Sequence, residues 1–337
     1  MGTKLGPIIE SQEIEIGDLS GKTFVIDAFN ILYQFLTTIR QYDGSFLTDS
    51  NGNITSHLSG LFFRTTNLMK QNLKLAFVFD GIAPELKKKE RDRRKSVKQE
   101  AQRKYDLAVE KGDIELMKKY ASRTAKLTSE QIDESKELIK ALGLPIIQAP
   151  SEGEAQAAYM VKKGDAYGLI SQDTDGLMFG SPKLIKNLSI SKKRKQGATY
   201  VKVGPELIDL SSNLNKLGLD IDQLIVLGIL CGTDFNIGGI KGIGPKKGLT
   251  LLKKHNQNFE ELFRETGWEF PYSWQKVFDT IKNMPISKEY DLIWKSVDSN
   301  KIRELLIKNH DFSEQRVEKV LEELTKKQAQ KGLSEFF

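Results

Sequence analysis

The sequence predicts an α/β protein in which a mostly parallel sheet is flanked by helices. Four short apolar runs show no alternation between polar and apolar residues, as expected of strands that are buried on both faces. Helix-like segments separate these runs, and a crossover helix is the usual connection between parallel strands. Acidic residues follow the runs, directly or after a short turn. The runs span residues 23–26, 75–79, 144–149 and 167–171.

The composition limits the class of protein. With 337 residues, the chain is long enough for one large domain or two ordinary ones with a sizeable core. Its net charge of +6 favours a polyanionic partner. The single cysteine, Cys231, excludes an internal disulfide framework and fits a reducing compartment. No apolar run approaches the roughly 20 residues of a membrane span, and the start lacks a secretory signal. We therefore expect a soluble intracellular protein with no membrane partner.

The N-terminal part alternates between expected strands and helices. Residues 1–16 are mildly apolar and are expected to form a short helix. An amphipathic helix follows Asp27, and a helix over 56–71 leads into the strand that ends at Asp80. Between these helices, an Asp-Gly and an Asn-Gly pair bracket a hairpin-like excursion within 43–52.

A long insertion follows the second strand. The next element that fits the sheet layer begins at a Thr-Ser-Glu capping signal at 128–130, which predicts a helix over 130–142. The intervening segment of more than 40 residues is far longer than an ordinary connection. Because residues 86–126 are rich in strong helix formers and lack proline, we expect a helical insertion over about 82–128.

Two interpretations of the insertion's charge remain open. Residues 86–126 carry 15 Lys/Arg and 7 Asp/Glu, whereas the rest of the chain has a net charge of −2. A solvated helical pair would be supported by i,i+4 contacts such as Lys88–Asp92 and Glu100–Lys104. A lid that contacts phosphates would use the excess positive charge directly after a candidate metal site. We favour the lid.

Carboxylates converge on one edge of the predicted sheet. Ligands of parallel sheets collect beyond the carboxyl ends of the strands, and seven acidic side chains follow the strands or an apolar helical run. So many like charges would destabilise the fold unless cations neutralised them. An all-oxygen set without a Cys or His cluster suits Mg²⁺ or Mn²⁺ rather than zinc. The candidates are Asp27, Asp80, Glu152, Glu154, Asp173, Asp175 and Asp234.

Each of these acids also has a simpler interpretation. Glu152 or Glu154, in the first turn of a helix after Ser151, could complement the helix dipole. Positions i and i+2 do not share a helix face, so both acids reach one site only at a frayed or strained helix start. An Asp after a strand is a common turn former. The coincidence of all seven favours the metal site.

Beyond the last carboxylate pair, the chain becomes mainly helical. Segments 184–190 and 198–203 are expected to be edge strands, and Gly204-Pro205 opens the helical remainder. An apolar run through Cys231 predicts a helix that precedes Asp234.

A glycine hairpin stands out within the helical remainder. Gly242 and Gly244 allow a tight turn, and the next residue is a proline at the first helical position. The helix N-terminus then presents free amide donors, with Lys246 and Lys247 beside them. Such a hairpin binds a phosphate backbone without reading the base sequence. A plain turn between packed helices is the competing interpretation.

The tail from Thr325 is polar and rich in Lys and Gln, yet it ends on apolar residues. Because chain termini fray, apolar side chains at a terminus are better explained by docking on a partner than by burial in the core. The residues of this pattern are Gln330, Leu333, Phe336 and Phe337.

Together these residues resemble the flap endonuclease branch of the XPG-type structure-specific nucleases, most closely its archaeal members. The resemblance extends over essentially the whole chain. The closing Gln-x-x-Leu-x-x-Phe-Phe resembles the box by which replication proteins dock on the sliding clamp. The other matching stretches are Val-Ile-Asp-Ala at 25–28, Val-Phe-Asp-Gly at 78–81, Ala-Pro-Ser-Glu-Gly-Glu-Ala at 149–155, Gln-Asp-Thr-Asp at 172–175, Gly-Thr-Asp at 232–234 and Lys-Gly-Ile-Gly-Pro-Lys-Lys at 241–247.

The resemblance implies a nuclease core of the PIN type, a helical arch over the active site and a helix–two-turn–helix that grips duplex DNA around a monovalent cation. It implies that the seven carboxylates hold two Mg²⁺ ions, for which Mn²⁺ can substitute. Lys87 and Arg94 match the residues that contact the scissile phosphate, and Tyr33 matches an aromatic residue that stacks on a nucleobase. The amino group of Gly2 lies near the site in the family.

The implied activity is that of a 5′ flap endonuclease, with 5′–3′ exonuclease activity besides, in DNA replication and repair. The expected partners are flapped DNA and, through the tail, the sliding clamp. The protein is expected to be monomeric on its own and cytoplasmic in an archaeal-type cell, or nuclear in a eukaryotic one. The rivals are a sister nuclease of the same superfamily and a non-catalytic DNA-binding adaptor that recruits the clamp.

The expected organisation has three parts. A nuclease core over 1–235 includes the insertion over about 82–128. A helical DNA-binding region over 236–325 includes the helix–two-turn–helix at about 236–256. A flexible clamp-binding tail covers 326–337.

Overall fold

The computed structural model describes residues 3–188, 193–196 and 199–334. Its main element is a seven-stranded sheet in the order β1-β9-β6-β5-β2-β3-β4. The five strands from β6 to β4 are parallel, and β9 pairs antiparallel with β6 and with β1. The predicted mostly parallel sheet is therefore confirmed. The strands are β1 Gln12–Glu13, β2 Thr23–Asp27, β3 Lys74–Phe79, β4 Ile146–Gln148, β5 Gly168–Ile170, β6 Lys183–Lys186 and β9 Glu206–Asp209.

Helices cover both faces of the sheet, which explains why its central strands lack polar alternation. On one face, the large side chains of β2 and β3, such as Phe24 and Phe77, pack against the first group of helices. On the other face, small side chains such as Val25 and Ala76 pack against the second group. The first group is α1 Ala28–Thr38, α2 Ser56–Lys70, α5 Ser129–Ala141 and α14 Glu314–Ser334; the second includes α6 Gly153–Lys163, α7 Asp175–Met178, α9 Ile221–Cys231, α10 Pro245–His255, α11 Phe259–Thr266 and α12 Trp274–Lys282.

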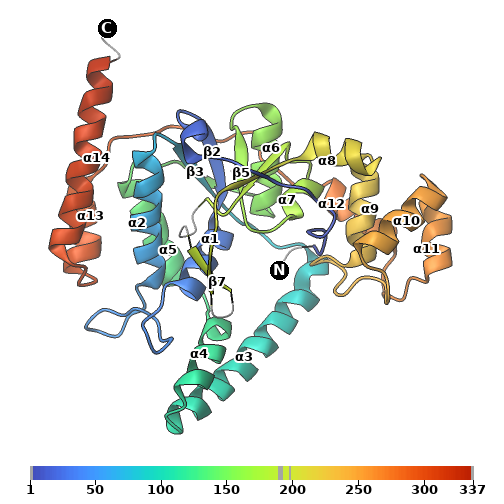
Figure 1. Cartoon of the computed structure of the whole chain (residues 1–337), viewed down its shortest axis with the longest axis horizontal. Helices are drawn as coiled ribbons and strands as arrows, with labels where there is room; N and C mark the ends of the chain where they lie inside the picture. The colour runs from blue at the N-terminus through green and yellow to red at the C-terminus, as the bar shows by residue number, and fades with distance from the viewer. Residues whose placement is uncertain (1–2, 189–192, 197–198, 335–337) are drawn as a thin grey trace.

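Two helices project away from the sheet as an antiparallel pair (Figure 1). A short 3-10 helix, Glu85–Lys87, leads into α3 Lys88–Glu110, and α4 Ile114–Thr124 returns toward the sheet. Between them, Gly112 takes a left-handed backbone conformation with φ of 62°. These helices occupy the segment in which the basic insertion is expected, and we call them the arch. The expected Glu100–Lys104 contact forms on α3, with an N–O distance of 2.5 Å.

The helical remainder divides between the two ends of the molecule. In Figure 1, α10 and α11 lie at one end, and α14 lies at the other. The remaining described helices are a 3-10 helix, Ile16–Leu19, α8 Leu210–Leu217, α13 Ser299–Ile302 and a π-helical turn, Arg303–Lys308, that precedes α14. Among the described residues, no helix has the length and apolar character that crossing a membrane requires.

Several expectations about the sheet edge and the N-terminus are wrong. The described part of residues 1–16 forms turns and β1 rather than a helix. Strand β6 lies inside the sheet, between β5 and β9. Residues 199–202 pair only with residues 193–196, in a separate two-stranded hairpin of β7 Lys193–Gln196 and β8 Thr199–Lys202. The helical remainder starts later than expected, because β9 follows Gly204-Pro205 and completes the sheet with β1.

The described part of the expected tail, residues 326–334, continues α14 as a helix. Residues 325–331 are Thr-Lys-Lys-Gln-Ala-Gln-Lys, and Lys, Gln and Ala are strong helix formers. Local propensity therefore extends the helix beyond the boundary that polarity alone suggested.

Candidate active site

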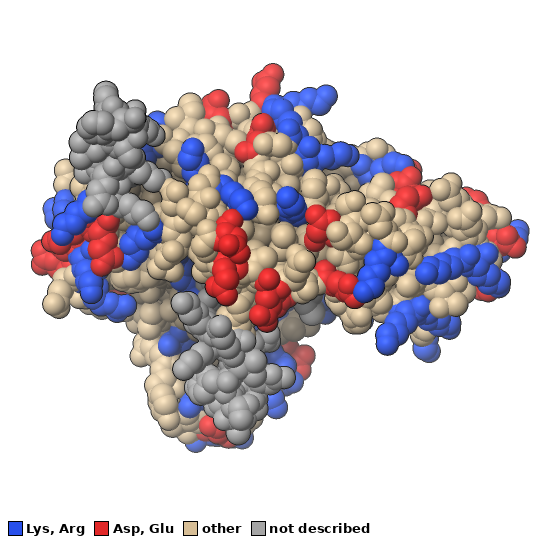
Figure 2. Space-filling view, turned by 45° about the horizontal axis from the view of Figure 1, so that its top comes forward, with Lys and Arg blue, Asp and Glu red and all other residues tan. Residues whose placement is uncertain are grey.

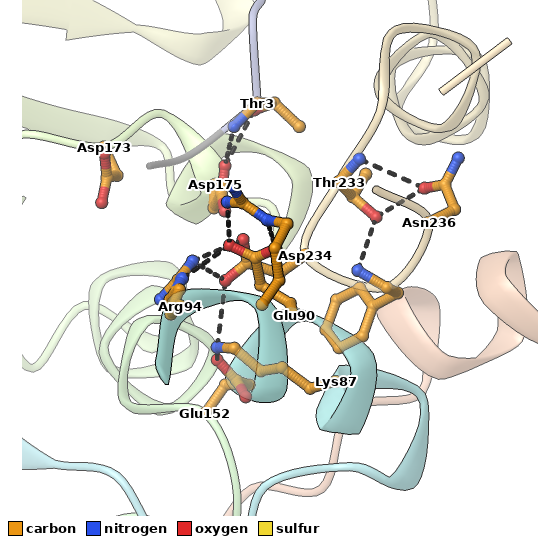
Figure 3. A network of polar contacts seen from close by, with 12 residues as sticks. Thr3, Lys87, Glu90, Arg94, Glu152, Asp173, Asp175, Thr233, Asp234 and Asn236 are labelled. Atoms are coloured by element: carbon orange, nitrogen blue, oxygen red, sulfur yellow. Dashed lines mark hydrogen bonds and ion pairs between the residues drawn. The ribbon is translucent and has the colours of Figure 1, made fainter. Parts of the chain in front are cut away.

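All seven predicted carboxylates line one cavity of about 580 Å³ at the carboxyl ends of the central strands. Lys87, Arg94 and Tyr33 line the same cavity. The structure thus brings together residues that lie more than 200 positions apart in the sequence. Figure 3 shows how several of these side chains converge from the sheet edge, the arch and the turn after α9.

Neighbouring strands β2 and β3 each deliver one acid. Asp27 is the last residue of β2, and its side chain caps α1 by accepting a hydrogen bond from the backbone N–H of Asn30 at 3.1 Å. Asp80 follows β3 and accepts from the backbone N–H of Gly153 at 2.6 Å. A Cβ on residue 153 would lie 2.7 Å from Asp80 Oδ1, so only a glycine lets α6 begin this close to Asp80.

The two glutamates at the start of α6 do not serve as simple helix caps. Glu152 is the N-cap residue, but its side chain makes no capping bond and instead accepts a hydrogen bond from Lys87 Nζ at 2.5 Å. Glu154 accepts from Ser171 Oγ at 2.7 Å. Because Glu152 has extended rather than helical backbone angles, both side chains can face the cavity despite their i,i+2 spacing.

The pair after β5 is held by residues from distant parts of the chain. Asp173 accepts a hydrogen bond from the side-chain amide of Asn30 at 3.0 Å. Asp175 accepts from the backbone N–H of Thr3 at 2.7 Å and from its hydroxyl at 2.8 Å. The N-terminal segment therefore reaches the cavity and fixes one of its acids.

Asp234 lies in a tight turn after α9. The turn is braced by Asn236, whose Oδ1 accepts from the Thr233 hydroxyl at 2.7 Å and whose side-chain amide donates to the Ile229 carbonyl at 2.7 Å. Asp234 receives two hydrogen bonds of 2.7 Å from Arg94 Nη2, and Lys87 Nζ lies 3.4 Å from its carboxylate. The base of the arch is thus tied to the cavity by ion pairs.

Burial and mutual repulsion raise the pKa values of five carboxyl groups in the cavity. Burial and the charge of Asp80 raise the pKa of Asp27 to about 8, against the effect of the hydrogen bond from Asn30. Burial raises the pKa of Asp175 to about 6, although the hydrogen bonds from Thr3 oppose this shift. Burial also raises the pKa of Asp80, Glu152 and Glu154. The cavity therefore carries more negative charge than the protein itself compensates.

The negative charge of the cavity also raises the pKa values of Lys87 and Arg94. Burial alone would lower the pKa of Lys87, but the charges of Glu152 and Asp234 outweigh burial and raise it. The pKa of Arg94 is likewise raised, because Asp234 and Glu90 outweigh its burial. Both cations are therefore firmly protonated at neutral pH.

The donor set fits Mg²⁺ or Mn²⁺ in type and charge, since every acid offers hard oxygen donors. As the side chains lie, no three Asp, Glu, His or Cys residues in the described part of the chain are arranged to chelate one ion. Lys87 donates a hydrogen bond to Glu152, and Arg94 donates to Asp234. Other acids of the cavity accept hydrogen bonds from neighbouring residues, such as Asp173 from Asn30. In this arrangement, these contacts take up oxygens of the candidate ligands.

Several residues that line the cavity are absent from the sequence-based prediction. Lys98 Nζ lies 4.6 Å from the ring centre of Tyr33 and 3.4 Å from its hydroxyl. Arg93 and Arg123 also line the cavity from the arch. Nothing distinguishes these three among the 15 cations of residues 86–126. Asn30 gives a weak signal as the third residue after Asp27.

The predicted glycine hairpin lies outside this cavity. Gly242 has a φ of 77°, and Gly244 is the N-cap residue of α10, with Pro245 in its first turn. Both glycines, Lys246 and Lys247 are exposed. Figure 2 shows Lys and Arg side chains gathered at the end of the molecule formed by α10 and α11.

The tail residues are only partly described. Gln330 and Leu333 lie within α14, whereas Phe336, Phe337 and the N-terminal Gly2 fall outside the described residues. The predicted clamp-binding role of the tail and the expected place of Gly2 stay predictions.

Comparisons with known proteins agree with this arrangement. Family models match residues 2–101 as an XPG N-terminal domain and residues 143–234 as an XPG I-region. A Flap endonuclease 1 from Staphylothermus marinus is 48% identical over 349 aligned residues, which cover 100% of both chains. A solved structure of flap endonuclease-1 from Methanococcus jannaschii is 37% identical, covers 96% of this chain and 98% of its own, and superposes with a TM-score of 0.77.

More distant structures share the fold. The catalytic core of Rad2 in complex with a DNA substrate superposes with a TM-score of 0.69, covering 96% of this chain and 100% of that one. At 23% identity, this likeness shows the fold alone. The full-length identity to the flap endonucleases and the two XPG matches carry the assignment: the chain belongs to the flap endonuclease family of XPG-type nucleases.

Proposed function

We propose that this protein is a 5′ flap endonuclease that hydrolyses phosphodiester bonds at flapped DNA junctions. The observation that carries the proposal is the single cavity in which seven carboxylates meet cations from the arch, among them Lys87 and Arg94. This arrangement suits a reaction on a phosphate whose negative charge grows during hydrolysis. The exonuclease activity on 5′ ends is part of the same proposal, because it requires the same cavity.

The seven carboxylates would hold two Mg²⁺ ions, or Mn²⁺ in their place. Bound divalent ions supply positive charge that lowers the pKa of water and stabilises the departing oxygen. The surplus charge of Asp27, Glu154 and their neighbours supports this assignment, since their raised pKa values signal missing positive charge. Asn30, Thr3 and Ser171 would orient the acids that they contact.

Lys87 and Arg94 would contact the scissile phosphate. In the structure both cations are bonded to carboxylates of the cavity, Glu152 and Asp234. Each therefore exchanges a carboxylate for a phosphate oxygen when DNA enters. Because the cations are positioned beforehand at the base of the arch, this exchange needs no long-range movement of charge.

Surfaces away from the cavity would hold the rest of the substrate. Tyr33 offers a ring on the cavity wall for stacking on a nucleobase, which requires Lys98 to leave its place over that ring. The turn at Gly242 and Gly244, with Lys246 and Lys247, would bind the duplex backbone, helped by a monovalent cation. Gln330, Leu333, Phe336 and Phe337 would dock on the sliding clamp.

A cleavage assay with three DNA substrates tests the proposal. The purified chain is titrated with Mg²⁺ in the presence of a 5′-flapped duplex, a blunt duplex or a four-way junction. We expect Mg²⁺-dependent incision near the base of the flap and much slower reaction with the other two. Preference for the junction would indicate a sister nuclease, and binding without incision would indicate a non-catalytic adaptor.

A further inference from the structure

One buried carboxylate near the cavity has no part in the proposed mechanism. Glu90, in the first turn of α3, is 2% exposed and does not line the cavity. Its Oε1 accepts hydrogen bonds from Arg94 Nε and from Arg93 Nη2, each at 2.7 Å, and its Oε2 accepts from Arg93 Nε at 2.7 Å. A buried carboxylate is stable only when it is well paired, and Glu90 is paired entirely with these two arginines among the described residues.

Arg94 is held by different atoms of its guanidinium group on two sides. Its Nε donates to Glu90, whereas its Nη2 donates to both oxygens of Asp234. Figure 3 shows Arg94 beside both acids, with Glu90 on the arch and Asp234 on the turn after α9. Glu90 therefore binds the Nε atom of Arg94, which lies nearest the helix. The Nη2 atom stays available for a partner in the cavity.

We infer that Glu90 is a positioning residue, which holds Arg94 aimed into the cavity while Nη2 changes its partner from Asp234 to a substrate phosphate. This inference rests on the proposed function, in which Arg94 contacts the scissile phosphate. A planar guanidinium fixed at one edge loses less conformational freedom when its other edge forms a new bond. Without Glu90, Arg94 would have to be ordered anew in each reaction cycle.

The structural alternative is that Glu90 only stabilises the start of α3. An acid in the first turn of a helix complements the helix dipole, and its i,i+3 and i,i+4 pairs with Arg93 and Arg94 support any helix. The two roles differ in their dependence on Arg94. A positioning role disappears when Arg94 is removed, whereas a helix-stabilising role persists.

A double-mutant cycle on the full chain separates the two roles. The single-turnover cleavage rate of a 5′-flapped duplex is measured at saturating protein and Mg²⁺ for the wild type, Glu90→Gln, Arg94→Ala and the double variant. Dissociation constants for the same DNA are measured alongside. Glu100→Gln is the matched control, because it removes the same charge and an i,i+4 ion pair from the same helix. Glu90→Asp provides a second variant that keeps the charge.

We expect Glu90→Gln to slow cleavage by roughly tenfold, with less than about a twofold change in affinity for DNA. In the Arg94→Ala background, the same substitution should change the rate by less than about twofold. Glu90→Asp should show the same dependence on Arg94, and Glu100→Gln should cleave at the wild-type rate.

Three outcomes would overturn the inference. If Glu90→Gln cleaves at the wild-type rate while Arg94→Ala is slow, Glu90 does not position Arg94 and the proposed function stands. If the losses multiply in the double variant, Glu90 acts on the helix rather than through Arg94. If Arg94→Ala cleaves at the wild-type rate, the proposed role of Arg94 fails and the inference fails with it.

Discussion

Two of the polar clusters in the described part of the chain contain buried carboxylates whose pKa values shift in opposite directions. In the cavity, the pKa of Asp27 is raised to about 8 by burial and by the charge of Asp80. In the second cluster, the burial of Asp49 alone would raise its pKa, but hydrogen bonds from Asn53 and His310 outweigh burial and lower it. The cavity has a surplus of negative charge, whereas in the second cluster hydrogen bonds within the protein satisfy the charge of Asp49.

The second cluster joins four segments: the loop that contains Asp49, the start of α2, α5 and the residues that precede α14. His310, which precedes α14, lies with its Nδ1 3.0 Å from Asp49 and its Nε2 3.3 Å from Glu134 on α5. His57, at the start of α2, is fully buried, with its Nε2 3.3 Å from the other oxygen of Glu134. Asp311 is tied to the same loop as Asp49 by a hydrogen bond from the backbone N–H of Ser50 at 2.8 Å.

The comparison teaches how a structural cluster differs from one that is built for an external partner. Asp49 receives hydrogen bonds from two backbone amides and two side chains, so its charge is satisfied within the protein. The cavity is lined by seven acids and five cations, so its acids outnumber its cations; the cations are Lys87, Arg93, Arg94, Lys98 and Arg123. Uncompensated like charge, rather than burial or the number of polar groups, is the reason for which we propose the cavity as a site for cations.

The largest effect on the cleavage rate should come from removing one of the cavity's seven carboxylates. Asp80→Ala or Asp175→Ala should reduce flap cleavage by on the order of a thousandfold or more, because bound metal lowers the activation barrier by several kcal/mol. Affinity for DNA should persist or increase, since a negative charge that faces phosphates is lost. Cleavage rates and dissociation constants check this prediction. Substantial Mg²⁺-dependent cleavage by either folded variant would remove the basis of the metal assignment.

The cations of the cavity should have a smaller effect. Lys87→Ala should slow single-turnover cleavage by on the order of a hundredfold, the scale of losing one positioned electrostatic contact. Affinity should change far less, because Lys87 is bonded to Glu152 before DNA binds. If the variant cleaves at the wild-type rate when saturated, the arch is only a solvated helix pair.

The sequence predicted the cavity well because its chemistry follows directly from strand ends. Apolar runs that end in Asp27 and Asp80 place both acids at one edge of any parallel sheet. The contact between Thr3 and Asp175 could not be predicted, since it joins residues 172 positions apart by the fold alone. The same reason hides the second cluster, in which Asp49 and His310 are separated by 261 positions.

The sheet edge was missed for a local reason. The strand β9 has only four residues, Glu-Leu-Ile-Asp, and follows a Gly-Pro pair that usually starts a turn or a helix. Its identity as a strand depends on pairing with β6 and β1, which local pattern does not reveal. The helical extension of α14 was missed because polarity was given more weight than helix propensity.

The exposed lysines of the glycine hairpin should affect the binding of duplex DNA rather than the cleavage step. Lys246→Ala with Lys247→Ala should weaken binding to duplexes of any sequence equally. The slope of log affinity against log salt should fall by about one unit for each phosphate contact that is lost. Binding titrations at several salt concentrations measure this slope. An unchanged slope would show that the hairpin is only a turn between α9 and α10.

The pH dependence of stability without metal should have opposite signs in the two clusters. Burial lowers the pKa of His57, so the folded protein resists its protonation, and stability should fall as pH decreases below about 6.5. Asp27 titrates near pH 8 in the folded chain and near pH 4 when unfolded, so stability should fall as pH rises across that range. In a chelator, the two effects therefore oppose each other below about pH 6.5, and the loss of stability caused by Asp27 remains alone between about pH 6.5 and 8. His57→Leu should reduce the fall in the unfolding midpoint as pH decreases, and Asp27→Asn should reduce the fall as pH rises. Unaltered pH profiles of the midpoint in both variants would contradict this prediction.

The most direct test compares one matched substitution in each cluster. Asp27→Asn and Asp49→Asn each replace an ionisable carboxyl group by a neutral amide that keeps an acceptor oxygen, and thermal unfolding near pH 7.5 is followed in a chelator and in Mg²⁺. We expect Asp27→Asn to unfold a few degrees higher than the wild type in chelator and to gain less from Mg²⁺. Asp49→Asn should unfold lower in both conditions and gain as much from Mg²⁺ as the wild type does. If Asp27→Asn is destabilised in chelator, or keeps the full stabilisation by Mg²⁺, the cavity does not carry the surplus charge that defines it as a metal site.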